Sequence, residues 1–158
     1  MTRESGKSRW GLTMGSRHLK PTYGRVELVE IDLTPRCDDG SLPENSILQQ
    51  WYAKLMQATE ASGYPLAYQS DTRQLLHEAG FVEVQEAIIN LPYNPWPKDL
   101  FMRDVGRWYC LGFCDAIQAL TMGPFTNTMN VGAAAVNEWV NRVHQEVCNR
   151  KIHAYNRM

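Results

Sequence analysis

Two short apolar runs along the chain have the pattern of β-strands. The first, at positions 24–33, is rich in valine, leucine and isoleucine and is bounded by Gly24 and Pro35. Its apolar residues fall on both faces, which is typical of a strand buried in an α/β sheet. The second run, at 81–91, alternates imperfectly between apolar and polar residues. Because a two-stranded sheet rarely stands alone, the pattern predicts an incomplete α/β domain.

Four other stretches repeat their apolar residues at helical spacing. The first of them follows Asn45 and Ser46, either of which can cap it, and it stops at Gly63. The longest one contains Gly106 and Gly112, near which a bend is expected. The chain order therefore predicts strand, helix, helix, strand, helix, helix. The three helices after the first are predicted at 71–79, 99–122 and 133–149.

Composition and charge exclude several classes of protein. The chain has 158 residues, of which 44% are hydrophobic and 21% charged, as in one soluble domain. Its net charge is −1 and no basic stripe is present, so nucleic-acid binding is not indicated. No apolar run is long enough to cross a membrane, and residues 1–18 form a loose basic leader that lacks a secretory signal. We expect a cytoplasmic or nuclear protein.

Charged residues at the end of the first predicted strand are candidates for a substrate site. Asp32 and Arg36 lie at and just after the carboxyl end of this strand, the edge that faces the ligand crevice in open α/β sheets. A carboxylate there can position a substrate or act as a base. The Asp-Asp-Gly sequence at 38–40 is also typical of a simple solvated turn, and this second interpretation is the favoured one. No catalytic residue is assigned.

Aromatic residues provide a second set of candidates, because several of them can line a pocket for a planar substrate. Trp51 lies on a helical stripe, where packing in the core is the competing interpretation. Trp96 lies in a proline-rich extended segment, and Trp108 lies on the long predicted helix. We include all three tryptophans as substrate-pocket candidates.

The cysteines raise the question of a metal site. Cys110 and Cys114 are one helical turn apart, and His144 and Cys148 have the same spacing, so a four-ligand zinc site is geometrically conceivable. However, free cysteines are common in buried helices, and this is the favoured interpretation. We therefore expect no metal.

Four motifs point to a known family. They are HLKP followed by GRVELVEIDLTPRCDDGSLPEN, then HEAGFVEVQE, LPYNPWPKDLFMRDVGRW and KIHAY. Together they resemble the LaeA-like fungal class I methyltransferases, from the region around the fifth strand of that fold to the start of its final strand. The resemblance covers residues 18–155, nearly the whole chain.

This resemblance implies a Rossmann-like fold, S-adenosylmethionine as cofactor, a small-molecule substrate and a role in fungal secondary metabolism. It implies one of two roles in that metabolism, as a pathway enzyme acting on small molecules or as a nuclear regulator bound to a velvet-type protein. The chain departs from the family in having no glycine-rich G-x-G-x-x-G turn for the cofactor. Residues 19–155 are therefore expected to form a partial methyltransferase-like domain holding the C-terminal strands and the substrate-side helices, with a tail at 156–158.

Three interpretations of this partial domain remain open. The first is a truncated methyltransferase-like protein that neither binds S-adenosylmethionine nor methylates alone. The second is a non-catalytic module that docks on a velvet-type or methyltransferase partner. The third is a fragment of a longer coding sequence. In the family the seventh strand lies between the fifth and the sixth, and only its start, KIHAY, is recognised here. We therefore expect the strands at 24–33 and 81–91 to lack this neighbour. Their unpaired backbone groups would make the isolated chain unstable.

Overall fold

The structure, a computed structural model, describes residues 24–66 and 71–158, so the predicted leader at 1–18 lies outside the described residues. Its contacts divide the chain into two units. The larger comprises Glu30–Tyr68 and Ile88–Met158, and the smaller comprises Met1–Val29 and Gln69–Ala87. The described residues form helices and a small sheet, as the α/β prediction requires.

The first helix of the larger unit, α2 (Ile47–Ala61), has the two ends that the sequence predicts. The Ser46 hydroxyl accepts a hydrogen bond from the Gln49 amide at 3.3 Å, which satisfies one free donor of the first turn. After the helix, Gly63 takes a φ of +78°, a left-handed conformation that favours glycine.

Two further helices complete the larger unit. Helix α4 (Leu100–Gly123) begins at Asp99, whose carboxylate accepts from the backbone of the first turn, and it continues without a break through both of its interior glycines. At its end Pro124 starts a π-helical turn, η1 (Pro124–Thr128). Helix α5 (Ala133–Val147) then returns along the unit. The predicted helices at 99–122 and 133–149 are confirmed to within two residues.

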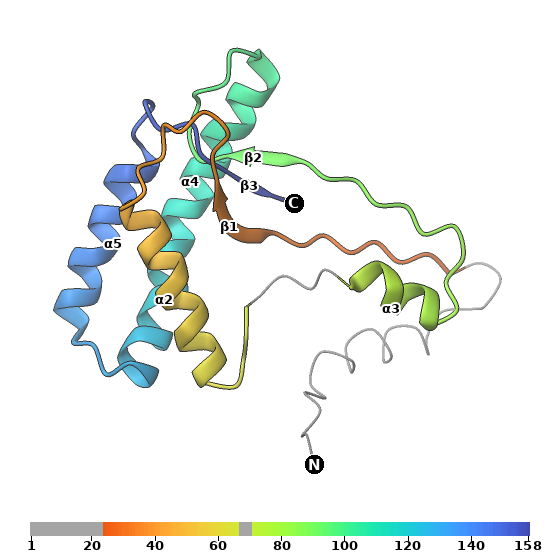
Figure 1. The fold of residues 1–158 in the computed structure, drawn as a ribbon, viewed down its shortest axis with the longest axis horizontal. Coiled ribbons are helices and arrows are strands. Elements are labelled where there is room, and N and C mark those ends of the chain that lie inside the picture. The colour runs from red at the N-terminus through yellow and green to blue at the C-terminus, as the bar shows by residue number, and fades with distance from the viewer. Residues whose placement is uncertain (1–23, 67–70) are drawn as a thin grey trace. The chain divides into compact units, whose positions relative to one another are not determined.

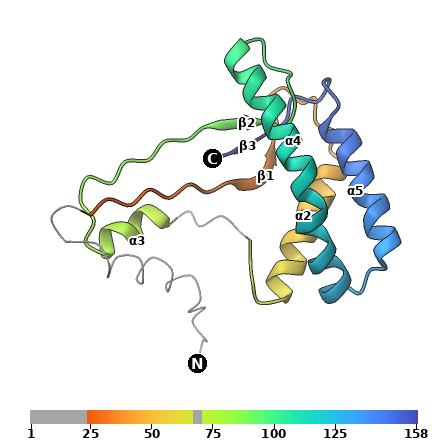
Figure 2. The same ribbon diagram turned by 180° about the vertical axis from the view of Figure 1, so that it is seen from behind.

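The core of the larger unit lies among these helices. Helix α5 packs against both α2 and α4, so the three helices form one group in both views (Figures 1 and 2). At the centre Trp51 is fully buried, and its indole Nε1 donates to the Thr121 hydroxyl at 2.8 Å. The Phe113 ring meets it edge to face. The largest side chains that are fully buried here include Trp51, Tyr93, Phe125, Leu48, Leu55, Ile117, Val136, Val143 and Val147.

A three-stranded antiparallel sheet covers one end of this helical group. Strand β3 (Tyr155–Arg157) lies in the middle, between β1 (Asp32–Arg36) and β2 (Asn90–Pro92). Figure 1 shows the three strands meeting near the C-terminus. The ladder continues one residue beyond β3, because Met158 exchanges two backbone hydrogen bonds with Ile89. Strand β1 contacts α2 and β2 contacts α4, which fixes the sheet on the helices.

The sheet corrects the expectation that the two predicted strands have no strand between them. Residues 155–157 form that middle strand, and two residues of the predicted tail at 156–158 belong to it. The predicted strands at 24–33 and 81–91 were placed too early, since strand pairing starts at Asp32 in the first and at Ile89 in the second. The short β3 offers partners to few residues, and a strand forms only where its backbone groups are paired. In residues 24–31 the apolar side chains are consequently exposed, Val29 by 65%.

The described part of the smaller unit contains one helix, α3 (Thr72–Glu78), which confirms the prediction at 71–79. It ends before Gly80, whose φ of +91° is again left-handed. None of its side chains is fully buried, so the apolar stripe of this helix is only half-covered. Within the described residues of both units, no helix is long and apolar enough to cross a membrane.

Candidate functional site

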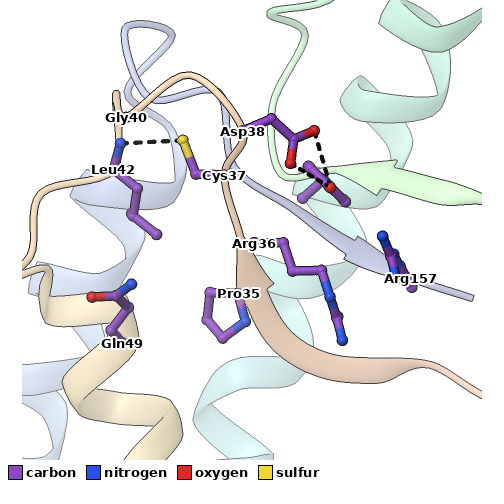
Figure 3. A pocket seen from close by; sticks show the side chains of 9 residues that line it. Pro35, Arg36, Cys37, Asp38, Gly40, Leu42, Gln49 and Arg157 are labelled. Carbon is purple, nitrogen blue, oxygen red and sulfur yellow. Dashed lines mark hydrogen bonds between the residues drawn. The ribbon is translucent and has the colours of Figure 1, made fainter.

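An open pocket of about 380 Å³ lies where β1 ends and the following loop begins. Figure 3 shows that its side chains come from β1, the loop after it, α2 and β3. Two positively charged residues, Arg36 and Arg157, stand on the two paired strands. The full lining is Pro35, Arg36, Cys37, Asp38, Gly40, Leu42, Gln49, Tyr155 and Arg157.

Two of the predicted site residues form an ion pair beside this pocket. The Arg36 Nη2 donates to Asp32 Oδ2 at 2.6 Å, and both side chains are largely shielded from solvent. The Thr34 amide and hydroxyl donate to the other oxygen, Asp32 Oδ1, at 3.0 and 2.6 Å. Burial alone raises the pKa of Asp32, but the hydrogen bonds from Thr34 and from the guanidinium outweigh it and hold the pKa below its ordinary value. Asp32 is therefore ionised, and its ion pair with Arg36 holds the guanidinium group in position.

Replacing Asp32 by asparagine is expected to lower the free energy of unfolding at pH 7 by about 1–2 kcal/mol, because charge-assisted bonds from Thr34 and Arg36 are lost. A depressed carboxyl pKa contributes stability above the unfolded-state value of about 3.9, and this contribution disappears as the pH falls through the lower folded-state value. The difference in the free energy of unfolding between wild type and D32N, measured by urea denaturation, should therefore become smaller below about pH 4. Asp104→Asn, in an exposed pair with Arg107, is the control and should change little. A pH-independent D32N difference would contradict the ionised pair.

The Asp-Asp-Gly turn is attached to the segment that leads into β3. The Tyr155 hydroxyl donates to both oxygens of Asp38, at 2.9 and 3.1 Å. Asp39 accepts from the Ser41 amide at 3.0 Å and pairs with His153 Nδ1 at 2.5 Å. Hydrogen bonds from Ser41 first, and then from His153, lower the pKa of Asp39. Both carboxylates are exposed, as the interpretation as a turn predicts. They also attach the loop that lines the pocket to Tyr155 and His153, which lie more than a hundred positions later in the chain.

The structure does not bring the three candidate tryptophans together around this pocket. Trp51 is fully buried in the helical core, as its helical stripe would have required. Trp96 is half-buried, with its Nε1 donating to the Ala154 carbonyl and its ring stacked on His153 at 4.9 Å. Trp108 is 74% exposed on α4 and does not line the pocket. Of the five candidates, Arg36 lines the pocket and Asp32 positions it.

Among the pocket residues that the sequence analysis missed are Tyr155 and Arg157. They lie on β3, which pairs with β1 so that Arg36 is opposite Tyr155 and Asp32 is opposite Arg157. The sequence analysis placed Tyr155 at the end of the domain and Arg157 in a tail. No pattern of neighbouring residues in this stretch indicated a site. Only the KIHAY motif, as the start of a strand, carried a signal that these residues reach the sheet.

Three of the four cysteines lie together away from the pocket. The Sγ of Cys148 is 3.8 Å from that of Cys110 and 4.0 Å from that of Cys114. Burial, followed by the neighbouring Cys148, raises the pKa of Cys110 to about 11 and that of Cys114 to about 12. His144 was the fourth ligand of the zinc site considered from the sequence. Its Nε2 lies 2.9 Å from the Cys114 carbonyl oxygen and is therefore engaged with the backbone.

Comparison with known proteins gives strong similarity to fungal regulators. The chain is 49% identical over 140 residues to the secondary metabolism regulator LAE1 of Cochliobolus heterostrophus, which covers 88% of this chain and 46% of that protein. It is 41% identical over 140 residues to the protein-methionine methyltransferases laeA of Chaetomium globosum and Emericella nidulans, of which it covers 44% and 37%. The chain thus spans less than half the length of these relatives. No protein-family model and no solved structure matches it.

Proposed function

Because the chain belongs, over 140 of its residues, to the LaeA-like family of fungal proteins, we propose that it forms the substrate-side part of a methyltransferase-like regulator of secondary metabolism. The 49% identity to a secondary metabolism regulator carries this proposal. The protein would act in the cytoplasm or nucleus, and the methyl group would come from S-adenosylmethionine bound by the remainder of a longer protein or by a partner subunit.

The sheet supports a fold related to the class I methyltransferases. In that fold, the resemblance places the seventh strand antiparallel between the fifth and the sixth. Strand β3 has this position between β1 and β2 and is antiparallel to both. The helices α2 and α4, which pack beneath these strands, would then belong to the substrate side of the complete protein.

The described residues do not fit the cofactor itself. The chain has no glycine-rich turn to let a backbone approach a bound nucleoside. The acidic groups near the pocket are already engaged, since Asp38 accepts from Tyr155 and Asp32 pairs with Arg36. What the pocket offers is a wall of polar side chains, with Arg36 and Arg157, suited to orienting a methyl acceptor. Methyl transfer depends mainly on such alignment of the acceptor with the sulfonium group.

A calorimetric titration with S-adenosylmethionine tests whether the cofactor site lies outside this chain. The chain alone is expected to give no saturable heat, because the cofactor turn is absent from its sequence. The full-length protein-methionine methyltransferase laeA of Chaetomium globosum, measured in parallel, serves as the positive control. Binding by the chain at micromolar concentrations would overturn the proposal, because the chain would then build a cofactor site of its own.

A second candidate function is that of a non-catalytic module docking on a velvet-type or methyltransferase partner. It is favoured by one exposed apolar face of α4, on which Phe101 and Trp108 are each 74% exposed and Leu111 is 56% exposed. These residues are separated by seven and three positions, so they follow one side of the helix. A melting curve recorded with the titration separates the two functions. Stabilisation by the protein partner without cofactor binding favours the docking module, whereas a sharp melt of the chain alone argues against it.

A further inference from the structure

We propose that Cys110, Cys114 and Cys148 form a binding site for a thiophilic metal ion, and that Zn²⁺ is the ion that fits it. All three Sγ atoms lie within 4.8 Å of one another. The shortest separations, 3.8 and 4.0 Å, join Cys148 to the two cysteines of α4. This site is separate from the pocket at the end of β1, and it does not depend on methyltransferase activity.

Two of the three distances between the sulfur atoms are close to those of a zinc-thiolate site. A tetrahedral zinc ion with Zn–S bonds of about 2.3 Å holds its sulfur ligands about 3.8 Å apart. The observed separations therefore require shifts of only a few tenths of an ångström for two of the three pairs. A disulfide would need a sulfur separation of about 2.05 Å, so these cysteines are not placed as a bonded pair. Thiolate ligands favour soft and borderline ions such as zinc over magnesium or calcium.

The helices hold the three cysteines in place before any ion binds. Cys110 and Cys114 are one turn apart on α4, and Cys148 is the capping residue directly after α5. Buried valines on α5, including Val143 and Val147, fix this end of the helix in the core. The contact between His144 Nε2 and the Cys114 carbonyl oxygen joins the two helices beside the sulfur atoms. The ligands are therefore preorganised by packing that exists for other reasons.

The fourth coordination position would be taken by solvent. His144 is held by the Cys114 carbonyl, and Cys148 is exposed, so water can reach the ion. Three protein ligands with an open fourth position are a known arrangement for zinc. On binding, each of the three thiols releases one proton to solvent, and Zn²⁺ with three thiolates and a neutral water carries a net charge of −1. No oxidation or reduction occurs.

A spectroscopic titration of the reduced, metal-free chain tests the site, with Co²⁺ as the probe and Zn²⁺ as the competitor. We expect one Co²⁺ per chain, a thiolate-to-cobalt charge-transfer band and the intense visible bands of tetrahedral coordination, all removed by one equivalent of Zn²⁺. Cys148→Ser, at the exposed ligand, should weaken binding by more than about 100-fold, since even changes in the groups around ligands cost 10–100-fold. Cys37→Ser, outside the cluster, is the matched control and should bind normally.

Two measurements keep the result interpretable. Circular dichroism of each metal-free variant shows whether it folds, and Cys148→His restores a zinc ligand at the same position and should recover most of the affinity. Absence of the charge-transfer band in the folded, reduced wild type would overturn the proposal. So would equal loss of binding in C37S and C148S, or rapid formation of a disulfide within the cluster that Zn²⁺ does not slow.

Discussion

Replacing Gly106 by alanine is expected to lower the free energy of unfolding by about 2–4 kcal/mol, or to prevent folding, because the added methyl group has no room. A Cβ built on Gly106 would lie 2.5 Å from the carbonyl oxygen of Asn94 and 2.9 Å from its carbonyl carbon, with Pro92 Cβ at 3.3 Å. The nearest atoms belong to backbone, which cannot rotate away as a side chain can. The glycine therefore allows α4 to touch the segment that follows β2.

Gly112 provides the control for this substitution, because it lies in the same helix and a Cβ there meets no atom within 4 Å. Gly112→Ala should raise stability by up to about 1 kcal/mol through the better helix propensity of alanine. Urea denaturation of both variants is therefore expected to give effects of opposite sign. A stabilising or neutral Gly106→Ala would show that α4 does not approach Asn94 as closely as the structure indicates.

The helices could be predicted from the sequence because their ends depend on neighbouring residues. Ser46 caps α2, and glycines at 63 and 80 take left-handed conformations where α2 and α3 end. The strands could not be placed in the same way. Their apolar composition suggested 24–33 and 81–91, but pairing is limited to the residues opposite Tyr155–Met158. A strand's bounds depend on its partner, and the partner here lies at the far end of the chain.

The candidate sites follow the same division between local and distant information. Asp32 and Arg36 were named together because they lie at and just after the end of one predicted strand, but their ion pair was not predicted. Residues four positions apart on a regular strand are about 13 Å apart, whereas the pairing of β1 with β3 is irregular between Asp32 and Arg36. The approach of Cys148 to Cys110 required α4 and α5 to pack in a particular register, which spacing along one helix does not determine. Trp108 was chosen for its residue type alone, and the face of the helix on which it lies turned out to be solvent-exposed.

Replacing Asn94 by alanine is expected to lower the free energy of unfolding by about 3–5 kcal/mol, because several buried carbonyl groups lose their donor together. The Asn94 side chain is 1% exposed. Its Nδ2 lies 3.0 Å from the Val147 carbonyl oxygen, 3.2 Å from that of Asn149 and 3.1 Å from that of Ile152. These acceptors include the end of α5 and the turn that leads into β3. The amide thus satisfies carbonyl groups that a helix end leaves without partners.

Two further substitutions separate this role from simple packing. Asn94→Asp keeps the size of the side chain but replaces the donor by a carboxylate facing three carbonyl oxygens, so it should be at least as destabilising as alanine. Asn137→Ala removes an exposed amide on α5 that makes one long contact with Gln118, and it should change stability by less than about 0.5 kcal/mol. Thermal and urea unfolding measure all three variants. If Asn94→Asp were as stable as wild type, the amide would not be the donor that holds the turn before β3, and the position of Tyr155 in the pocket would need another cause.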